Sequence, residues 1–568
     1  MLTRSNILAD FIKNNKLTLA FTFVVSLFSN LFTIIIPISI GKFYNLTFGL
    51  NTHRSQVLDF LPAWFWDTSP RFLTFFLVLI FLKLLFDFLQ QFQVGRVGEK
   101  MLLYIRGKLF YSQLYMPMQV YDEKGIGKYL LRHSGDLKSI QNYVTKGLVG
   151  FSVDMLLLGL VFTTIGILNA GLAVIMAVFL PIFGVLMTLL NRALHGRSLA
   201  QRNYKSGLLS FVNATLRGIL SLKAFNRLTP EMSRYVKRST KVYEAGIRYH
   251  QVRSVIMAVI PGLLYLMLFA ILYYTYYRQQ QGQLSLDAGS LLTAILLLVT
   301  AMPVFRRTLR VNTVWELGKI SFSKLLLVLN QPADDDRLGA EFKFKKGEIA
   351  FEEVKFKYTG AQKSIIYEDC FIHSNSLTRV YGHTGSGKTT LLKLLIGVYL
   401  PTGGKILVDS QDIKQVTKKS LRKCISVVPG DWPIYGKTVF EAISYSRKAD
   451  KRPKAEVVLE RVQSSCPAAT RLTLDTRIGD LGCNLSKGQK KLLAFARALL
   501  SDKPILIIDE PFSGLDIPTQ VHLSKLILEL KDMKTIIVLE QDAHNEYLPA
   551  DYTLCLGKNE IQEMVDTR

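Results

Sequence analysis

Long apolar runs dominate the first three hundred residues of the chain. Six of them have the roughly 20 mostly apolar residues that a helix needs to cross the hydrocarbon core of a bilayer. Buried helices of soluble proteins are rarely this long and this uniformly apolar, so the pattern predicts six membrane-spanning helices. The first run is too long for a signal-peptide core, and no small-residue cleavage site follows it, so we expect it to be retained. The runs are residues 17–41, 72–94, 148–168, 172–190, 254–277 and 288–305.

The pattern changes after the sixth run. The segment NQPADDDRLGAEFKFKKG is polar and aperiodic, and the strand-like IAFEEVKFKY follows it. From there to the end of the chain, strand and helix patterns alternate, which is typical of an α/β domain. We therefore expect a transmembrane domain with long cytoplasmic loops over residues 1–329, a linker over 330–347 and an α/β domain over 348–568.

Charge sets the orientation of the predicted spans. Residues 191–253 carry thirteen Lys or Arg against two acids, whereas residues 42–70 hold two of each sign. By the positive-inside tendency, the long loops after the second and fourth spans are cytoplasmic. Six spans then place both termini in the cytoplasm. We expect a multi-pass integral membrane protein of the cell (inner) membrane.

The overall charge and the cysteines agree with this topology. The formal net charge is +26 over 568 residues. The basic residues gather in the predicted cytoplasmic loops, where anionic headgroups attract them, so we expect membrane lipid and no nucleic acid among the partners. The five cysteines all fall in the C-terminal third without a CxxC pair, which is typical of reduced structural thiols in a cytosolic domain.

A phosphate-binding motif opens the α/β half. Residues 381–390 read YGHTGSGKTT, in which Gly382, Gly387, Lys388 and Thr389 fit GxxxxGK[ST] ahead of a helical run. Glycines let backbone N–H groups converge on phosphate oxygens, the lysine meets the outer phosphates, and the threonine reaches Mg²⁺. The motif predicts an ATP site. Its other members are His383, Thr384, Gly385, Ser386 and Thr390.

A second motif supports hydrolysis. PILIIDEP, residues 504–511, is an apolar strand that ends in Asp509 and Glu510. A buried strand of this kind delivers an acid to its C-terminal end, where Asp509 can hold Mg²⁺ and Glu510 can polarise an attacking water. The two motifs together predict a P-loop ATPase domain that uses ATP and Mg²⁺.

Taken together, the motifs resemble the ATP-binding cassette (ABC) family of transporters. LSKGQ, residues 485–489, is similar to the family signature, and the order Tyr358, GHTGSGKT, LSKGQ, ILIIDE, SGLD is the family's order. TRIGDLG before the signature, and LRHSGDLKSIQNYV and LRGILSLKAF in the membrane half, look like segments of exporter-type half-transporters. The resemblance covers residues 17–560. It implies six transmembrane helices fused to a cytosolic nucleotide-binding domain.

The resemblance also implies roles for further residues. Tyr358 would stack on adenine. Ser486, Gly488 and Gln489 would complete the ATP site of a second subunit, which implies a homodimer or a heterodimer with another half-transporter. Asp516 would lie at that dimer interface. Two short segments, residues 121–127 and 218–225, would be coupling helices that dock on the nucleotide-binding domains.

Three positions depart from the family pattern. Gly430, in VVPGDWP, stands where the family has a glutamine that reaches Mg²⁺ or water. Gln541, in TIIVLEQDAHN, stands where a histidine normally contacts the γ-phosphate, although a three-residue slip would supply His544 instead. Lys487 replaces a signature glycine and adds a cation near the neighbouring phosphate. The expected catalytic residues are Lys388, Glu510 and Gln541.

Two functions remain open at this stage. In the first, the chain is an ATP-driven exporter that moves a lipid, a peptide or another amphipathic molecule by alternating access as a dimer. In the second, it is an ATP-binding regulatory or catalytically impaired subunit of a heterodimeric complex. Glu510 favours the first, whereas Gly430 and Gln541 favour the second and predict slow hydrolysis. The transported substrate is unknown.

Charged residues in the membrane half give a partial indication of the substrate. Lys83 and Asp87 lie one helical turn apart near the middle of the second span, as a mutual ion pair or as substrate contacts. Arg306, Arg307 and Arg310 follow the sixth span, either as anchors that reach headgroups or as the lining of an inner-leaflet entrance for an anionic lipid.

Overall fold

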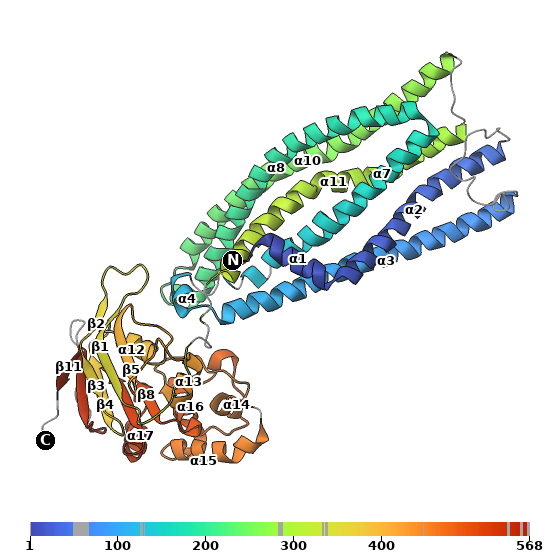
Figure 1. The fold of residues 1–568 in the computed structure, drawn as a ribbon. Coiled ribbons are helices and arrows are strands. Elements are labelled where there is room, and N and C mark those ends of the chain that lie inside the picture. The colour runs from blue at the N-terminus through green and yellow to red at the C-terminus, as the bar shows by residue number, and fades with distance from the viewer. Residues whose placement is uncertain are drawn as a thin grey trace. The chain divides into compact units, whose positions relative to one another are not determined.

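The chain folds into two compact units, each described here by itself. One unit holds Met1–Leu114 and Gly127–Gln331, and the other holds Tyr115–Ile126 and Pro332–Arg568. The computed structural model (Figure 1) describes residues 2–48, 68–124, 129, 131–133, 135–281, 288–331, 334, 339–446, 448–541, 546–556 and 561–564.

The first unit is helical. Its long helices lie side by side (Figure 1), and the longest contact runs between α8 and α10. Four of the long helices contain an internal proline, which removes a backbone hydrogen bond. The elements are α1 (Arg4–Asn14), α2 (Lys16–Thr47), α3 (Ser69–Leu114), a 3-10 turn (Leu131–His133), α6 (Gly135–Asn142), a π-helix (Tyr143–Gly150), α7 (Phe151–Leu168), α8 (Ala170–Arg217), α9 (Ile219–Ala224), α10 (Leu228–Gln280) and α11 (Ala288–Leu329).

The predicted six spans are confirmed. Within the described residues, six helices are long and apolar enough to cross a membrane, and each contains one of the predicted runs. Large apolar side chains such as Phe81, Phe88 and Phe269 are more than 60% exposed, as expected for surfaces that face lipid. The helices extend well past the spans: the 53 residues of α10 rise about 80 Å, far more than a bilayer core.

A π-helix interrupts the third span. Residues Tyr143–Gly150 are π-helical between α6 and α7. Trp315 of α11 donates its indole N–H to the carbonyl of Gly147 at 2.8 Å. A Cβ at Gly147 would lie 2.9 Å from the Trp315 ring, so only glycine lets the two helices approach this closely. Single π-helical turns are often found at functional sites.

The second unit is an α/β domain with one short helix from the membrane half, α4 (Met118–Lys124). Its strands are β1 (Ile349–Phe356), β2 (Ile365–Tyr367), β3 (Cys370–Ile372), β4 (Leu377–Gly382), β5 (Gly403–Val408), β6 (Gln411–Asp412), β7 (Ile425–Val428), β8 (Ile505–Asp509), β9 (Thr535–Glu540), β10 (Tyr552–Leu556) and β11 (Ile561–Met564). Its other α-helices are α12 (Lys388–Leu395), α13 (Lys418–Cys424), α14 (Val439–Ser444), α15 (Arg452–Gln463), α16 (Lys487–Ser501) and α17 (Ile517–Leu530).

Two sheets organise this unit. The smaller sheet is antiparallel in the order β2-β1-β5-β6, with β3 also paired to β1. The larger sheet has the order β11-β10-β4-β9-β8-β7 and is parallel from β10 to β7. The ends of β4 and β8 lie at the same edge of this sheet, because β9 pairs in parallel with both strands. The phosphate motif and the acidic strand end therefore meet.

Both faces of the larger sheet are buried. In β8, Ile505 and Ile507 pack into one hydrophobic cluster with α12 and the smaller sheet, whereas Leu506 and Ile508 pack into another with α14, α15 and α16. Successive side chains of a strand point to opposite faces, so ILII must be apolar throughout. This layering holds the carboxyl end of β8 rigidly. The six spans and the α/β domain predicted from sequence are both confirmed.

Candidate ATP site and membrane cavity

The phosphate loop connects β4 to α12. Gly385 and Gly387 have φ values of +87° and +105°, which favour glycine, and a Cβ at Gly382 would lie 2.7 Å from both Ser386 Oγ and Leu556 O. Ser386 Oγ is buried and has no hydrogen-bond partner among the described residues. A tight glycine cradle at a helix N-terminus, with an unsatisfied hydroxyl inside it, fits a phosphate group.

Lys388 begins α12 and folds over this loop. Its ammonium donates to the carbonyl of Gly382, and to that of His383 at 3.1 Å. Burial lowers the pKa of the Lys388 ammonium, while Glu510 and Asp509 act in the opposite direction. Thr389 is exposed and lines the same pocket as Asp509. A hydroxyl and a carboxylate are hard oxygen ligands, so this pair fits Mg²⁺.

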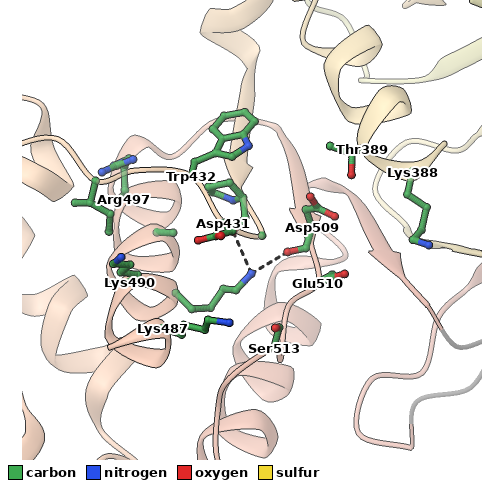
Figure 2. Close-up of a pocket in the computed structure, with 15 residues that line it drawn as sticks. Lys388, Thr389, Asp431, Trp432, Lys487, Lys490, Arg497, Asp509, Glu510 and Ser513 are labelled. Atoms are coloured by element: carbon green, nitrogen blue, oxygen red, sulfur yellow. Dashed lines mark hydrogen bonds between the residues drawn. The ribbon is translucent and has the colours of Figure 1, made fainter. Parts of the chain in front are cut away.

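The pocket beside the phosphate loop measures about 430 Å³ and is lined by charged side chains from α12, β8 and α16 (Figure 2). Asp509 ends β8 and is 8% exposed. Burial raises the pKa of its carboxyl, whereas the neighbouring Lys491 and Lys388, and a backbone hydrogen bond from Gly430, lower it. The cations around this carboxylate favour its ionised form, as a bound Mg²⁺ would.

Glu510 sits in a strained backbone conformation at the end of β8. Its φ is +48°, a region that non-glycine residues rarely adopt, and its N–H donates to Leu539 O at 2.9 Å. Its carboxylate accepts a hydrogen bond from Gln541 Nε2 at 3.1 Å. Strain of this kind collects at active sites. Glu510 and Gln541 thus meet, although 31 residues separate them. The alternative switch residue, His544, lies outside the described residues.

The loop that contains Gly430 passes close to Asp509. A Cβ at Gly430 would lie 3.3 Å from Asp509 Oδ2, so only the main chain of the loop lies against the carboxylate.

Lys491, which none of the sequence motifs singles out, reaches the backbone of Asp509 and of the Gly430 loop from α16 and is buried. The sequence did contain a sign of this role. Lys491 shares a helical face with Ala494, Phe495 and Ala498, which are all buried, so a lysine interrupts an otherwise apolar face of α16.

Tyr358, the predicted adenine-stacking residue, is partly buried beside the phosphate helix. Its hydroxyl and that of Thr390 are 2.8 Å apart. Its ring meets Phe356 and Tyr399 edge-on, at centroid distances of 4.9 and 5.6 Å. These contacts fix the ring near the phosphate loop, and stacking on adenine remains a prediction.

The signature residues cap α16. Ser486 Oγ accepts from the N–H of Gln489 at 3.1 Å, and Gln489 Oε1 accepts from the N–H of Ser486 at 3.0 Å, which is a complete capping box. A Cβ at Gly488 would lie 3.0 Å from Gly514 O, so this position admits little more than glycine. The polar groups of Ser486 and Gln489 are therefore engaged within the chain. Asp516 is the N-cap of α17.

The two predicted coupling segments both contain short helices. In the first, α4 belongs to the nucleotide-binding unit, and the Tyr399 hydroxyl donates to the Asp122 carboxylate. Residues 125–127 of that segment lie outside the described residues. In the second, α9 has no buried residue. Their coupling role remains a prediction.

A second cavity lies among α2, α3, the π-helix, α7 and α11 of the membrane unit. It measures about 890 Å³. The predicted pair of Lys83 and Asp87 is confirmed: the ammonium is 2.5 Å from the carboxylate, which also accepts from Ser29 Oγ at 2.5 Å. A cavity of this size can bury most of a small amphipathic molecule.

Arg307 behaves differently from a headgroup anchor. It lies within α11, which continues to Leu329, and its guanidinium binds Asp154 of α7 at 2.7 and 3.2 Å. The pair lines the cavity, whereas the neighbouring Arg306 does not. Lys146 of the π-helix also lines the cavity, and in the part of the chain that the structure describes it has no hydrogen bond or ion pair.

Fold and site define a class of protein. Six membrane-spanning helices are fused to an α/β domain that carries a phosphate loop, an acidic strand end and a capped signature helix. This combination is that of a multi-pass membrane ATPase in which nucleotide chemistry is coupled to a membrane domain.

Comparisons with known proteins identify the family. The model described as "ABC transporter transmembrane region" matches residues 19–302, and the one described as "ABC transporter" matches residues 369–513. The first match alone covers half of the chain, and the chain belongs to the ABC transporter family. Its membership was predicted from the motifs and is confirmed.

Several relatives extend over most of the chain. An ATP-dependent lipid A-core flippase of Mannheimia succiniciproducens is 26% identical over 503 residues, which is 86% of this chain and 83% of the relative. The uncharacterized ABC transporter ATP-binding protein YknV of Bacillus subtilis is 26% identical and covers 78% of this chain and 74% of its own length. The structure of a bacterial Atm1-family ABC exporter with ATP bound matches with a TM-score of 0.82 at 20% identity, over 96% and 94% of the two chains. This last likeness shows an exporter fold.

Proposed function

We propose that the chain is an ATP-driven exporter that works as a dimer by alternating access and moves an amphipathic molecule with an anionic group. The observation that carries this proposal is the joint presence of a phosphate loop beside an acidic strand end and a polar cavity in the membrane unit. The cavity lining holds three cations, Lys83, Lys146 and Arg307, against two acids, Asp87 and Asp154. Two of the cations are paired, and Lys146 is left for a ligand.

The position of Lys146 supports an anionic substrate. It precedes the predicted third span by two residues, and Arg307 follows the predicted sixth span by two, so both lie at the cytoplasmic end of the membrane in the predicted topology. A lysine at this interface is common because it can bind headgroups, but Lys146 also lines the cavity, where the anionic group of a ligand can reach it. Several relatives are ATP-dependent lipid A-core flippases, which favours a lipid as the amphipathic substrate.

The ATP site then performs three tasks with residues of this chain. The glycine cradle and Lys388 bind the phosphates, and Lys388 exchanges its carbonyl partners for phosphate oxygens. Asp509 and Thr389 would hold Mg²⁺, which supplies charge neutralisation at the β- and γ-phosphates when bound. Glu510, oriented by Gln541, accepts a proton from the attacking water.

The dimer supplies the remaining groups. The N-terminal end of α16, with Ser486 and Gly488, would approach the γ-phosphate across the interface, and closure of the two domains would shift the membrane helices from inward-facing to outward-facing. The partner is either a second copy of the chain or another half-transporter.

The first test is magnesium-dependent ATPase activity of the purified chain in lipid vesicles, beside Glu510→Gln and Lys388→Ala. We expect turnover in the unaltered chain and none in either variant. Glu510→Gln should still bind ATP, whereas Lys388→Ala should bind it at least about tenfold more weakly, because a charge-assisted phosphate contact is lost. ATP binding without turnover in the unaltered chain would favour the regulatory subunit, or an exporter that needs another half-transporter as its partner. Gly430 and Gln541 are the residues that support this second candidate.

The substrate class has a separate test. Vesicles with anionic phospholipid should stimulate turnover more than zwitterionic vesicles, and Lys146→Gln should abolish the difference. Arg306→Gln is the matched control, since it removes one nearby cation that does not line the cavity. Equal loss in both variants would show a general attraction of cations to anionic lipid and would remove the assignment of the cavity.

A further inference from the structure

Lys491 is a buried cation at the ATP site for which the three tasks above give no role. Its side chain is 3% exposed. The ammonium donates to Asp509 O at 2.8 Å and to Pro429 O at 3.0 Å, the dashed lines of Figure 2. Burial of an ammonium is unfavourable unless its hydrogen bonds are satisfied, so these two carbonyls are what hold it in place.

The two carbonyls lie at the point where strand pairing stops. β7 and β8 pair in parallel from Ile425 with Ile505 to Val428 with Ile508. Pro429 and Asp509 are the next residues after this last pair, so they lie just beyond the paired part of β7 and β8. Lys491 therefore links the two segments one residue past their last backbone pair.

The chain segments joined in this way carry the site. Pro429 is followed by Gly430, and the N–H of Gly430 donates to the Asp509 carboxylate. Gly430 has no side chain that could fix the loop. Asp509 is followed by Glu510, whose backbone is strained. Three acidic groups act on the ammonium: Asp431 of the loop, Asp509 at the end of β8 and Glu510 directly after it. A movement of the loop or of the strand end would displace both the metal ligand and the general base.

We propose that Lys491 is a positioning residue for ATP hydrolysis: by binding the carbonyls of Pro429 and Asp509, it holds the Gly430 loop and the acidic end of β8 in the geometry that Mg²⁺ and the attacking water require. This inference rests on the proposed ATPase function. It assigns to α16 a second task at the site of its own chain, besides presenting the signature to a partner.

A matched control exists in the same domain. Lys503 also donates to two backbone carbonyls, those of Arg422 at 2.7 Å and Ile425 at 2.9 Å, and burial also lowers the pKa of its ammonium. These carbonyls lie in α13 and at the first residue of β7, whereas the ATP site lies beyond the other end of β7. Lys503→Met therefore removes the same kind of structural link without touching the site.

The experiment compares Lys491→Met with Lys503→Met in the full chain in lipid vesicles. Both should lower the melting temperature. Lys491→Met should also reduce kcat at least about tenfold. Its affinity for a fluorescent ATP analogue should stay within about threefold of that of the unaltered chain, because the phosphate loop is built by other elements. Lys503→Met should leave kcat unchanged. Equal kcat in the two variants would overturn the proposal.

A second measurement needs no turnover. The Mg²⁺ concentration that half-saturates binding of the analogue should rise in Lys491→Met, since a displaced Asp509 binds the metal less well. A fall would overturn the proposal, because removal of a nearby positive charge acting alone strengthens Mg²⁺ binding. Lys491→Gln serves the same comparisons if the methionine variant does not fold. An unaltered chain without turnover refutes the proposed function for the chain as a homodimer, and the Mg²⁺ titration then still decides the role of Lys491.

Discussion

Gln541 offers the sharpest test of whether the altered switch position still serves hydrolysis. Replacement by alanine removes the amide that donates to Glu510 Oε1 at 3.1 Å. A hydrogen bond to a charged group contributes about 1.5 to 3 kcal/mol, but Gln541 is exposed, so solvent screening puts its value at about 1 to 1.4 kcal/mol. Each 1.4 kcal/mol is about tenfold in rate. Gln541→Ala should therefore lower kcat about five- to tenfold.

The assay separates orientation from binding. Magnesium-dependent turnover in lipid vesicles gives kcat, and a fluorescent ATP analogue gives affinity, which should change less than about twofold because Gln541 does not line the phosphate pocket. Gln541→Glu should reduce kcat further, since two carboxylates would then face each other.

Two controls complete this test. Gln411→Ala removes a glutamine that bonds the backbone of Lys343 from the antiparallel sheet, and it should leave kcat unchanged. Gln541→His should retain turnover, because an imidazole N–H can donate to the same carboxylate. The reasoning is refuted if Gln541→Ala keeps kcat within twofold of the unaltered chain. A large loss in His544→Ala instead would favour the slipped alignment.

Two further changes test the structure away from the ATP chemistry. Asp154→Asn should lower the free energy of unfolding by about 1 to 3 kcal/mol, and the value should lie toward the low end because Arg307 is 62% exposed. A thermal-unfolding assay measures this loss. Exchange of the pair, by Asp154→Arg together with Arg307→Asp, should recover most of it. Asp409→Ala should destabilise the nucleotide-binding unit by about 2 to 4 kcal/mol, measured by denaturant unfolding, because the buried carboxylate accepts four backbone N–H groups at 2.7 to 3.2 Å; a loss under about 1 kcal/mol would contradict this.

The fold could be predicted from the sequence because its signals are local. Apolar runs of bilayer length mark the spans, and the strand ILIID is apolar because both of its faces are buried. The ends of the helices could not be predicted in this way. Hydropathy measures contact with lipid, whereas a helix continues as long as its backbone is paired, so α11 runs on to Leu329 after the apolar pattern stops at Phe305.

The site was predictable where a motif is contiguous and not where partners come from distant segments. Lys388, Thr389, Asp509 and Glu510 were predicted because each lies in a short pattern with a chemical reason, and the structure brings them to one pocket. The bond between Arg307 and Asp154 spans 153 residues, and no spacing rule connects the two. The role of Lys491 depends on where two parallel strands cease to pair, which only the tertiary structure reveals.

Gly430 and Gln541, the two departures that predict slow hydrolysis, are compensated in part by contacts from distant segments of the chain. Gly430 removes a side chain from the loop beside Asp509, yet the main chain of that loop is held by Lys491 and donates to the carboxylate itself. Gln541 replaces an imidazole, yet its amide orients Glu510. A site that had lost hydrolysis would have no physical need for a buried lysine at the strand ends or for a strained glutamate with an ordered partner, since both features reduce stability. Their presence favours the active exporter over the regulatory subunit, and turnover of the unaltered chain decides between the two.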